Sequence, residues 1–311
     1  MKETMNPTQA VSLEPLDVVV VGEALIDIVD SPQGQTEYPG GSPANVAYGL
    51  GRLDVSVGLL TAVGRDARGE AIAAHLGSAG VVLLPGSQSL AKTATATAEI
   101  AANGSAEYTF DIEWALPPAT LPYAPKILHT GSIAAFLEPG ARVVRNLLEQ
   151  AQGGCMVTFD PNIRADLLGS HAEALGIFEG LVPLSNVVKL SEDDAGWLYP
   201  GKSLEEAAER ILGLGADLAV VTRGGDGSLM ATRATQLTVP AVRSVVADTI
   251  GAGDSYMSAL IMGLLLRGSE GLAPTVLERI GQTASMAASI TVGRPGANPP
   301  THRELLAGMA R

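Results

Sequence analysis

Short apolar runs alternate with longer helical segments along most of this chain, and this feature most constrains its fold. The runs are rich in β-branched residues and apolar on both faces, as strands buried within a sheet are. They are DVVVVGE, VSVGLLTAVG, KILHTGS, MVTFDPN, NVVKLS and LAVVTRGG. Crossover helices are expected between them at 43–53, 67–79, 139–152 and 203–213. The sequence therefore predicts a doubly wound α/β fold, with a mostly parallel sheet flanked by helices.

Two segments depart from this alternation and predict a small separate β-layer. Residues 93–112 alternate small, threonine and apolar residues around Asn103-Gly104, which is a strong hairpin signal. Residues 25–41 carry strand-like residues around a Pro-Gln-Gly turn. We expect both segments to project from the main sheet as a lid; an edge hairpin without a role in closure is the alternative. Residues 1–15 are expected to form a disordered tail, with Met5 as an alternative start, and residues 16–311 a single domain.

Charge and composition exclude several classes of protein. The net charge is −13 and no basic stripe is present, so binding to a nucleic acid backbone is not expected. The longest apolar run, 257–266, is shorter than the roughly 20 residues that cross a bilayer, so no membrane span is expected. Cys155 is the only cysteine, and no charged and apolar leader begins the chain, so we expect a cytoplasmic location. The four histidines lack metal-ligand spacing.

One segment matches the letters of a phosphate-binding P-loop but lacks its context. GWLYPGKS at 196–203 follows an acidic stretch rather than a strand, and Pro200 has no N–H to offer a phosphate. We therefore predict that Ser203 caps the following helix.

The segment DTIGAGDSYMSALIMGLLL places two glycines and an acid at the start of an apolar helix. The strand-like SVVAD precedes it. Glycines permit a sharp turn, which directs the backbone N–H groups of Gly251, Ala252 and Gly253 and the positive end of the helix dipole at one point. Asp254 lies beside that point and can accept a proton from an attacking hydroxyl. This pattern indicates phosphoryl transfer; the alternative is that Asp254 merely caps the helix.

Two further glycine-containing segments offer binding groups. GGSPANVAYGLGRL places Asn45 in the first turn of a helix, with Asp27 upstream, and these side chains suit neighbouring hydroxyls of a polyol. The alternatives are that Asn45 is a local cap and Asp27 a turn residue. VVTRGGDGSLM ends a strand at Thr222 and continues through Gly224 and Gly227, a loop suited to nucleotide phosphates and also to a hairpin turn.

The two signatures GGSPANVAYGLGRL and DTIGAGDSYMSAL, in this order and separation, resemble the ribokinase-like (PfkB) sugar kinases from about Asp17 to the C-terminus. The resemblance implies a small β lid, ATP-dependent phosphorylation of a primary hydroxyl, and homodimers formed through the lid. It makes Asp254 the general base and the amides of 251–253 an anion hole. It assigns the remaining contacts as follows: sugar at Asp27, Gly41 and Asn45; nucleotide at Lys189, Thr222, Gly224 and Gly227.

The resemblance also implies cations. Asp248 and the carbonyl of Ile250 resemble a monovalent cation site, which would take K⁺. The Mg²⁺-associated N-x-x-E box of the family is replaced here by Ser191-Glu192-Asp193-Asp194. Glu192 and Asp194 remain as candidates for indirect, water-mediated Mg²⁺ binding.

FDPNIR, together with GEALIDIV and YPGGSPAN, resembles the fructokinase branch of the family. Asp160 and Arg164 are expected to reach the acceptor from this strand-end loop, unless they pair with each other and brace it. Fructose is the predicted acceptor. The alternatives are 2-keto-3-deoxygluconate, ribose or a nucleoside, and, in another class, a sugar sensor without catalysis.

Overall fold

The computed structural model describes residues 15–31, 34–100, 106–121, 123–267 and 271–310, and these contain two β-sheets. The larger sheet has nine strands in the order β13-β12-β11-β10-β9-β8-β1-β4-β5. It is parallel except where β12 pairs with β11 and with β13. Its strands are β1 (Val18–Val21), β4 (Val57–Leu60), β5 (Val82–Leu83), β8 (Ile127–Gly131), β9 (Met156–Asp160), β10 (Val187–Ser191), β11 (Leu218–Thr222), β12 (Ser228–Ala231) and β13 (Gln236–Val239). The predicted doubly wound, mostly parallel sheet is confirmed.

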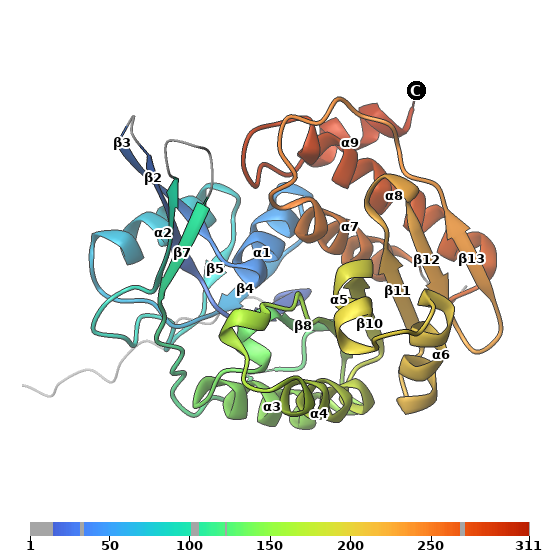
Figure 1. The fold of residues 1–311 in the computed structure, drawn as a ribbon, viewed down its shortest axis with the longest axis horizontal. Coiled ribbons are helices and arrows are strands. Elements are labelled where there is room, and N and C mark those ends of the chain that lie inside the picture. Colours follow the sequence, from blue (N-terminus) through green and yellow to red (C-terminus); the bar gives the residue numbers. More distant parts are fainter. Residues whose placement is uncertain (1–14, 32–33, 101–105, 122, 268–270, 311) are drawn as a thin grey trace, which may run out of the picture.

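Helices cover both faces of this sheet (Figure 1). One buried core packs the sheet against α3 (Gly140–Ala151), α4 (His171–Leu181), α5 (Glu192–Leu198) and α6 (Leu204–Leu214). A second core packs the other face against α1 (Ser42–Arg52), α2 (Ala67–Ser78), α7 (Ala252–Leu266), α8 (Pro274–Val292) and α9 (His302–Met309). Short 3₁₀ turns complete the described chain: η1 (Ser132–Ala135), η2 (Ala165–Leu167), η3 (Val182–Leu184) and η4 (Gly224–Asp226).

The strand order reverses between β1 and β8, and this reversal locates the place where a ligand fits. From β1 the chain moves outward through β4 and β5, and it then returns to the other side of β1 at β8. Connections that leave neighbouring strands in opposite directions open a crevice at the carboxyl ends of the strands. The turn after β1, the turn after β8 and the end of β9 therefore meet at one edge.

The smaller sheet is built from the two segments that interrupt the α/β alternation. It contains β2 (Leu25–Ser31), β3 (Gly34–Gly40), β6 (Thr95–Ile100) and β7 (Ala106–Asp111), in the order β3-β2-β6-β7. In Figure 1 it projects at the side of the molecule opposite to β12 and β13. The predicted Asn103-Gly104 turn and the tail at 1–14 lie outside the described residues.

Two local expectations have clear outcomes. Ser203 caps α6 by accepting a hydrogen bond from the Glu206 N–H, as predicted. The expected strand SVVAD is wrong, because residues 244–248 form no strand pairing. Val245 and Val246 are 89% and 62% exposed, so their β-branched side chains have no sheet or helix to cover them.

In the described part of the chain no helix has the length and apolar character of a membrane span.

Candidate active site

The turn before α7 has the geometry expected of a glycine turn. Gly251 adopts a left-handed φ of 74°, and a Cβ at this position would lie 2.7 Å from the Cβ of Ala297. Both the backbone angle and the close approach therefore require glycine. No side chain caps the first turn of α7. The Ala252 N–H donates to the Thr249 carbonyl at 3.3 Å, whereas the N–H groups of Gly251 and Gly253 have no partner among the described residues and are available to an anion.

Asp254 lies in this first turn, and its carboxylate is held by α1 rather than by its own helix. Oδ1 accepts a hydrogen bond of 2.6 Å from Ser42 Oγ, and Oδ2 accepts one of 2.9 Å from Asn45 Nδ2. The alternative in which Asp254 caps α7 is therefore wrong, as is the cap assigned to Asn45, because α1 has Gly41 at its N-cap position. The residue remains partly accessible.

The surroundings of Asp254 act on its protonation in opposite directions. Burial raises the pKa of the Asp254 carboxyl above its ordinary value, while the bonds from Ser42 and Asn45 and the charges of Lys189 and Arg164 act to lower it. A carboxylate with a raised pKa is a stronger base, as proton abstraction from an alcohol requires.

Asp27 lies in strand β2, so its assignment to a turn is wrong. It faces the end of β3, where a Cβ on Gly40 would lie 2.0 Å from Asp27 Oδ2. Gly41 has a φ of 99°, and a Cβ there would meet the Glu23 carbonyl at 2.7 Å. Asp27 has solvent-exposed surface, but the protein atoms packed around its carboxyl group desolvate it and raise its pKa to about 6. The charge of Arg164 opposes this shift. Asp254 also raises this pKa, which links the two carboxylates electrostatically.

Asp160 and Arg164 do not pair with each other, so the bracing alternative is wrong. Asp160 is 1% exposed at the end of β9, and its Oδ2 accepts a hydrogen bond of 2.8 Å from Lys189 Nζ. Arg164 instead donates to the carbonyls of Asn162 and Ile163 and to Asn162 Oδ1. Its positive charge lowers the pKa of Asp27 and of Asp254, so the guanidinium acts on both acids.

The loop predicted to hold the nucleotide follows β11 and forms the hairpin turn given as its alternative. Thr222 pairs with Ser228 in the antiparallel β11–β12 hairpin. Gly227 has a φ of 87°, and a Cβ there would lie 2.0 Å from the Val239 carbonyl, so hairpin packing requires this glycine. Gly224 has a φ of 49° and no atom within 4 Å of a built Cβ. The Gly224 side of the loop is therefore open to a ligand.

The acids assigned to cations have backbone partners. Asp194 accepts hydrogen bonds from the N–H groups of Ile163 and Ser191, at 2.8 and 2.9 Å. Glu192 is exposed in the first turn of α5. Asp248 accepts from the N–H groups of Ile250 and Gly296. Among the described residues no three His, Cys, Asp or Glu side chains form a metal-binding group, so they do not fit a divalent ion held by the protein alone.

Two residues beside the site were missed by the sequence reasoning. Ser42 directly follows Gly41 and supplies the shorter of the two bonds to Asp254. Glu23 follows β1, is 4% exposed, and accepts a hydrogen bond from the Ala134 N–H. Burial raises the pKa of Glu23 to about 8. An acid two residues after a fully apolar strand was a signal that could have identified it.

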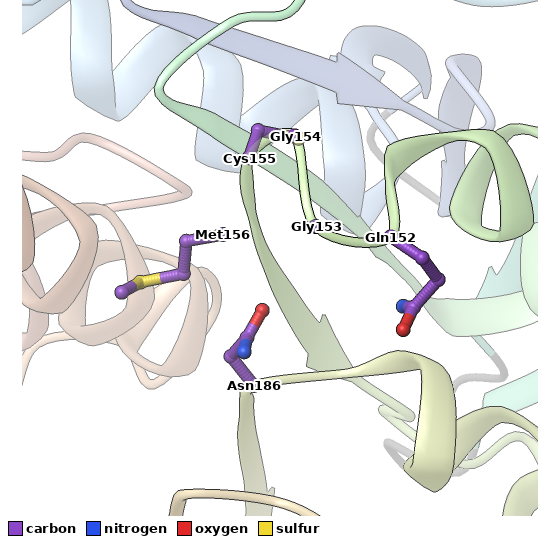
Figure 2. A pocket seen from close by; sticks show the side chains of 6 residues that line it. All are labelled: Gln152, Gly153, Gly154, Cys155, Met156 and Asn186. Atoms are coloured by element: carbon purple, nitrogen blue, oxygen red, sulfur yellow. The ribbon is translucent and has the colours of Figure 1, made fainter.

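A hollow at the opposite edge of the sheet is separate from this site. Figure 2 shows it between the start of β9 and the residue that precedes β10, lined by Gln152, Gly153, Gly154, Cys155, Met156 and Asn186. Asn186 bonds the Val157 N–H and Asp217, and Gln152 donates to the Leu184 carbonyl. These amide groups therefore already have partners within the protein.

The reversal of strand order, the uncapped glycine turn and the adjacent acid define an α/β phosphotransferase of the ribokinase-like class. A family model described as "pfkB family carbohydrate kinase" matches residues 15–303. The chain belongs to this family and is an ATP-dependent carbohydrate kinase. The resemblance inferred from the two signatures is thereby confirmed.

Individual relatives agree with this assignment. A fructokinase from Salmonella typhimurium is 32% identical over 285 residues, covering 87% of this chain and 90% of that protein. Fructokinase from Vibrio cholerae O395, solved with fructose, ADP and calcium bound, has a TM-score of 0.80 at 25% identity, covering 94% of this chain and 98% of that one. Aminoimidazole riboside kinase from Salmonella enterica shares the fold, with a TM-score of 0.81, 23% identity, and coverage of 94% and 99%.

Proposed function

We propose that this kinase transfers the γ-phosphoryl group of ATP to a primary hydroxyl of free fructose. The observation that carries the proposal is the Asp254 carboxylate, held by Ser42 and Asn45 in the first turn of α7, which no side chain caps. The proposed base, Asp254, thus lies next to the N–H groups proposed to bind the phosphoryl group, as in-line phosphoryl transfer requires. The choice of fructose follows from the 32% identical fructokinase.

In this mechanism the sugar binds between the small sheet and the carboxyl edge of the main sheet. Asp27, Gly41, Asn45 and the FDPNIR loop contact its hydroxyls. Asp254 takes the proton of the hydroxymethyl group as the oxygen forms its bond to the γ-phosphorus. The bond from that phosphorus to the β,γ-bridging oxygen breaks, and ADP leaves with the electron pair. The N–H groups of 251–253 stabilise the charge on the moving phosphoryl group.

Thr222, Gly224, Gly227 and Lys189 form the proposed nucleotide side of the site. Mg²⁺ would arrive bound to ATP, with Glu192 and Asp194 as neighbours of its water shell. Asp248 and the Ile250 carbonyl form the proposed K⁺ site, since a carboxylate that accepts two N–H bonds keeps further lone pairs. We further propose a cytoplasmic homodimer formed through β3 and β7, the outer strands of the small sheet.

A coupled ADP-release assay over fructose, ribose, 2-keto-3-deoxygluconate, adenosine and sugar phosphates tests the acceptor. We expect the highest kcat/KM for fructose. Turnover confined to another compound would replace fructose with that acceptor. Sugar binding without ADP release for any compound would favour the non-catalytic sensor.

The second candidate acceptor is 2-keto-3-deoxygluconate, and Arg164 favours it. The charge of the Arg164 guanidinium acts on Asp27 and Asp254, yet within the described residues its hydrogen bonds go only to its own loop. A sugar acid would offer it a carboxylate with matching geometry. Arg164→Lys should then reduce kcat/KM for the sugar acid far more than for fructose.

Acidification should weaken sugar binding through Asp27. Its carboxylate can accept hydrogen bonds from two hydroxyls, and protonation removes one acceptor. Because burial raises the pKa of Asp27 to about 6, the ionised form dominates at pH 7 and is lost as the pH falls through 6. If only that form binds, the dissociation constant for the sugar rises about tenfold from pH 7 to pH 5. Calorimetric titration of the sugar at several pH values measures this dissociation constant. Asp27→Asn should bind the sugar more weakly and with a flatter pH dependence. The same pH dependence in Asp27→Asn and the wild type would exclude this role of Asp27.

Sugar binding should close the small sheet as a lid. The backbone N–H groups of β6 and β7 are expected to exchange hydrogen more slowly when the sugar is bound. Trp114 is already buried, with Nε1 donating to the Ala134 carbonyl, so it acts as an anchor and should change little. Exchange measured by mass spectrometry with ATP alone is the control, and unchanged exchange in both strands on sugar binding would reject the lid.

A further inference from the structure

Strand register brings an acid and a lysine together on the sheet face covered by α7. Phe159 pairs with Val188, and both belong to the core on the opposite face, which packs against α3–α6. Side chains alternate along a strand, so the next residues, Asp160 and Lys189, turn toward the α7 face. They therefore stand side by side, Asp160 at the carboxyl end of β9 and Lys189 in the middle of β10.

These two side chains form a buried ion pair, and such a pair is weak evidence for a role in stability. Their Oδ2 and Nζ atoms are 2.8 Å apart, and the side chains are 2% and 5% exposed. The other oxygen of Asp160, Oδ1, is buried and has no hydrogen-bond partner among the described residues. A buried ion pair often loses as much by desolvation as it gains by attraction, and an unpaired oxygen shifts the balance further. A contribution to stability therefore does not explain why this ion pair is present.

Lys189 lies directly behind the turn that precedes Asp254. A Cβ built on Gly253 would be 3.3 Å from Lys189 Nζ. The ammonium group has three N–H donors, and Asp160 is its one hydrogen-bond partner within the described residues. Two donors are thus available beside the open N–H groups of α7.

The charges around this ammonium explain why a cation is needed there. Asp160, Asp194 and Asp254 all act on Lys189 from β9, α5 and α7. ATP would bring further negative charge to the same turn. Without Lys189, these carboxylates would repel the approaching phosphates. Arg164 is the other cation that acts on Asp254, and in the proposed mechanism it lies on the acceptor side.

We propose that Asp160 is a positioning residue: it fixes the Lys189 ammonium behind the 251–253 turn, where the ammonium stabilises the transferring phosphoryl group, and it does not contact the acceptor. This inference rests on the proposed kinase reaction. It replaces the acceptor contact that the FDPNIR motif predicts for Asp160.

Three variants separate this role from the others: Asp160→Asn, Lys189→Met, and the double variant Asp160→Leu with Lys189→Met. We expect Asp160→Asn to lower kcat about tenfold and Lys189→Met about a hundredfold, with the acceptor KM changed less than about twofold. The double variant removes both charges together, so its thermal unfolding temperature should stay near that of the wild type. Its kcat should remain as low as that of Lys189→Met.

Two results would overturn the proposal. A raised acceptor KM with normal kcat in Asp160→Asn would make Asp160 an acceptor contact. A double variant with wild-type kcat would make the pair purely structural. Asp17→Asn is the matched control, because it removes one partner of the exposed Asp17–Lys126 pair and should leave kcat unchanged.

The test remains informative if fructose is not the acceptor. The ratios of kcat are then measured with whichever compound is turned over. If none is turned over, the affinity for a non-hydrolysable ATP analogue is measured by calorimetry in wild type and variants. Lys189→Met should weaken that affinity about tenfold. Equal affinity would reject the role of Lys189 at the phosphates, whatever the acceptor.

Discussion

Asp254→Asn should lower kcat at least about a hundredfold while the KM for the sugar changes little. A general base typically contributes factors of 10² to 10⁴, and the amide cannot take the proton of the hydroxymethyl group. The substitution is nearly isosteric. Ser42 can still donate to the amide oxygen, and the Asn45 amide can rotate to accept from the new NH₂ group, so the fold should be retained.

The coupled ADP-release assay at saturating ATP measures this effect. Asp54→Asn is the matched control, since this acid is exposed and pairs with His302 away from the turn. Ser42→Ala should give an intermediate loss, because it removes one bond that orients the carboxylate without removing the base. Equal turnover by Asp254→Asn and the wild type would exclude Asp254 as the base.

Much of the main sheet was predictable because its strands are buried on both faces. Such strands appear in sequence as continuous apolar runs, and all six predicted runs contain a strand of the large sheet. Helices with a clear apolar stripe, such as α3 and α6, were also predictable within one or two residues. α8 was not, because the buried face of its second half is made of alanine, serine and threonine, which give no continuous apolar stripe in the sequence.

The site was predictable in its parts but not in its contacts. The glycines of the turn and Asp254 are adjacent in the chain, so the sequence alone reveals them. The bonds that Ser42 and Asn45 make to Asp254 span 212 and 209 residues, and they depend on α1 packing beside α7. The partner of Asp160 depends on the register of β9 against β10, which no motif encodes. The error at SVVAD has the same origin, since a β-branched run forms a strand only where a neighbouring strand is available.

In the proposed mechanism, the contacts between α1 and α7 couple the sugar side of the site to the base. α1 follows the small sheet directly, and its first turn bonds the acid in the first turn of α7. Movement of the small sheet on sugar binding would therefore displace Ser42 and Asn45. The base would reach its working position when the acceptor is in place, which would limit hydrolysis of ATP by water.

Gly251→Ala should reduce kcat by about a hundredfold and also lower stability. At a φ of 74°, an alanine is strained by about 1–2 kcal/mol. Its Cβ would also lie 2.7 Å from the Cβ and 2.8 Å from the Cα of Ala297, so the turn must shift. A shift moves the N–H groups of 251–253 away from the phosphoryl group, and losing one such donor typically lowers kcat by 10²–10³.

Gly153→Ala separates the backbone strain from the displacement of the turn. Gly153 has the same φ of 74°, but no atom lies within 4 Å of its built Cβ. This control should therefore show a lower thermal unfolding temperature with unchanged kcat. Adding Ala297→Gly to Gly251→Ala removes one of the two close contacts and should recover part of the lost kcat, whereas the strain at φ 74° remains. Wild-type turnover by Gly251→Ala would mean that the phosphoryl group is stabilised elsewhere, because the turn cannot keep its geometry with a Cβ at this position.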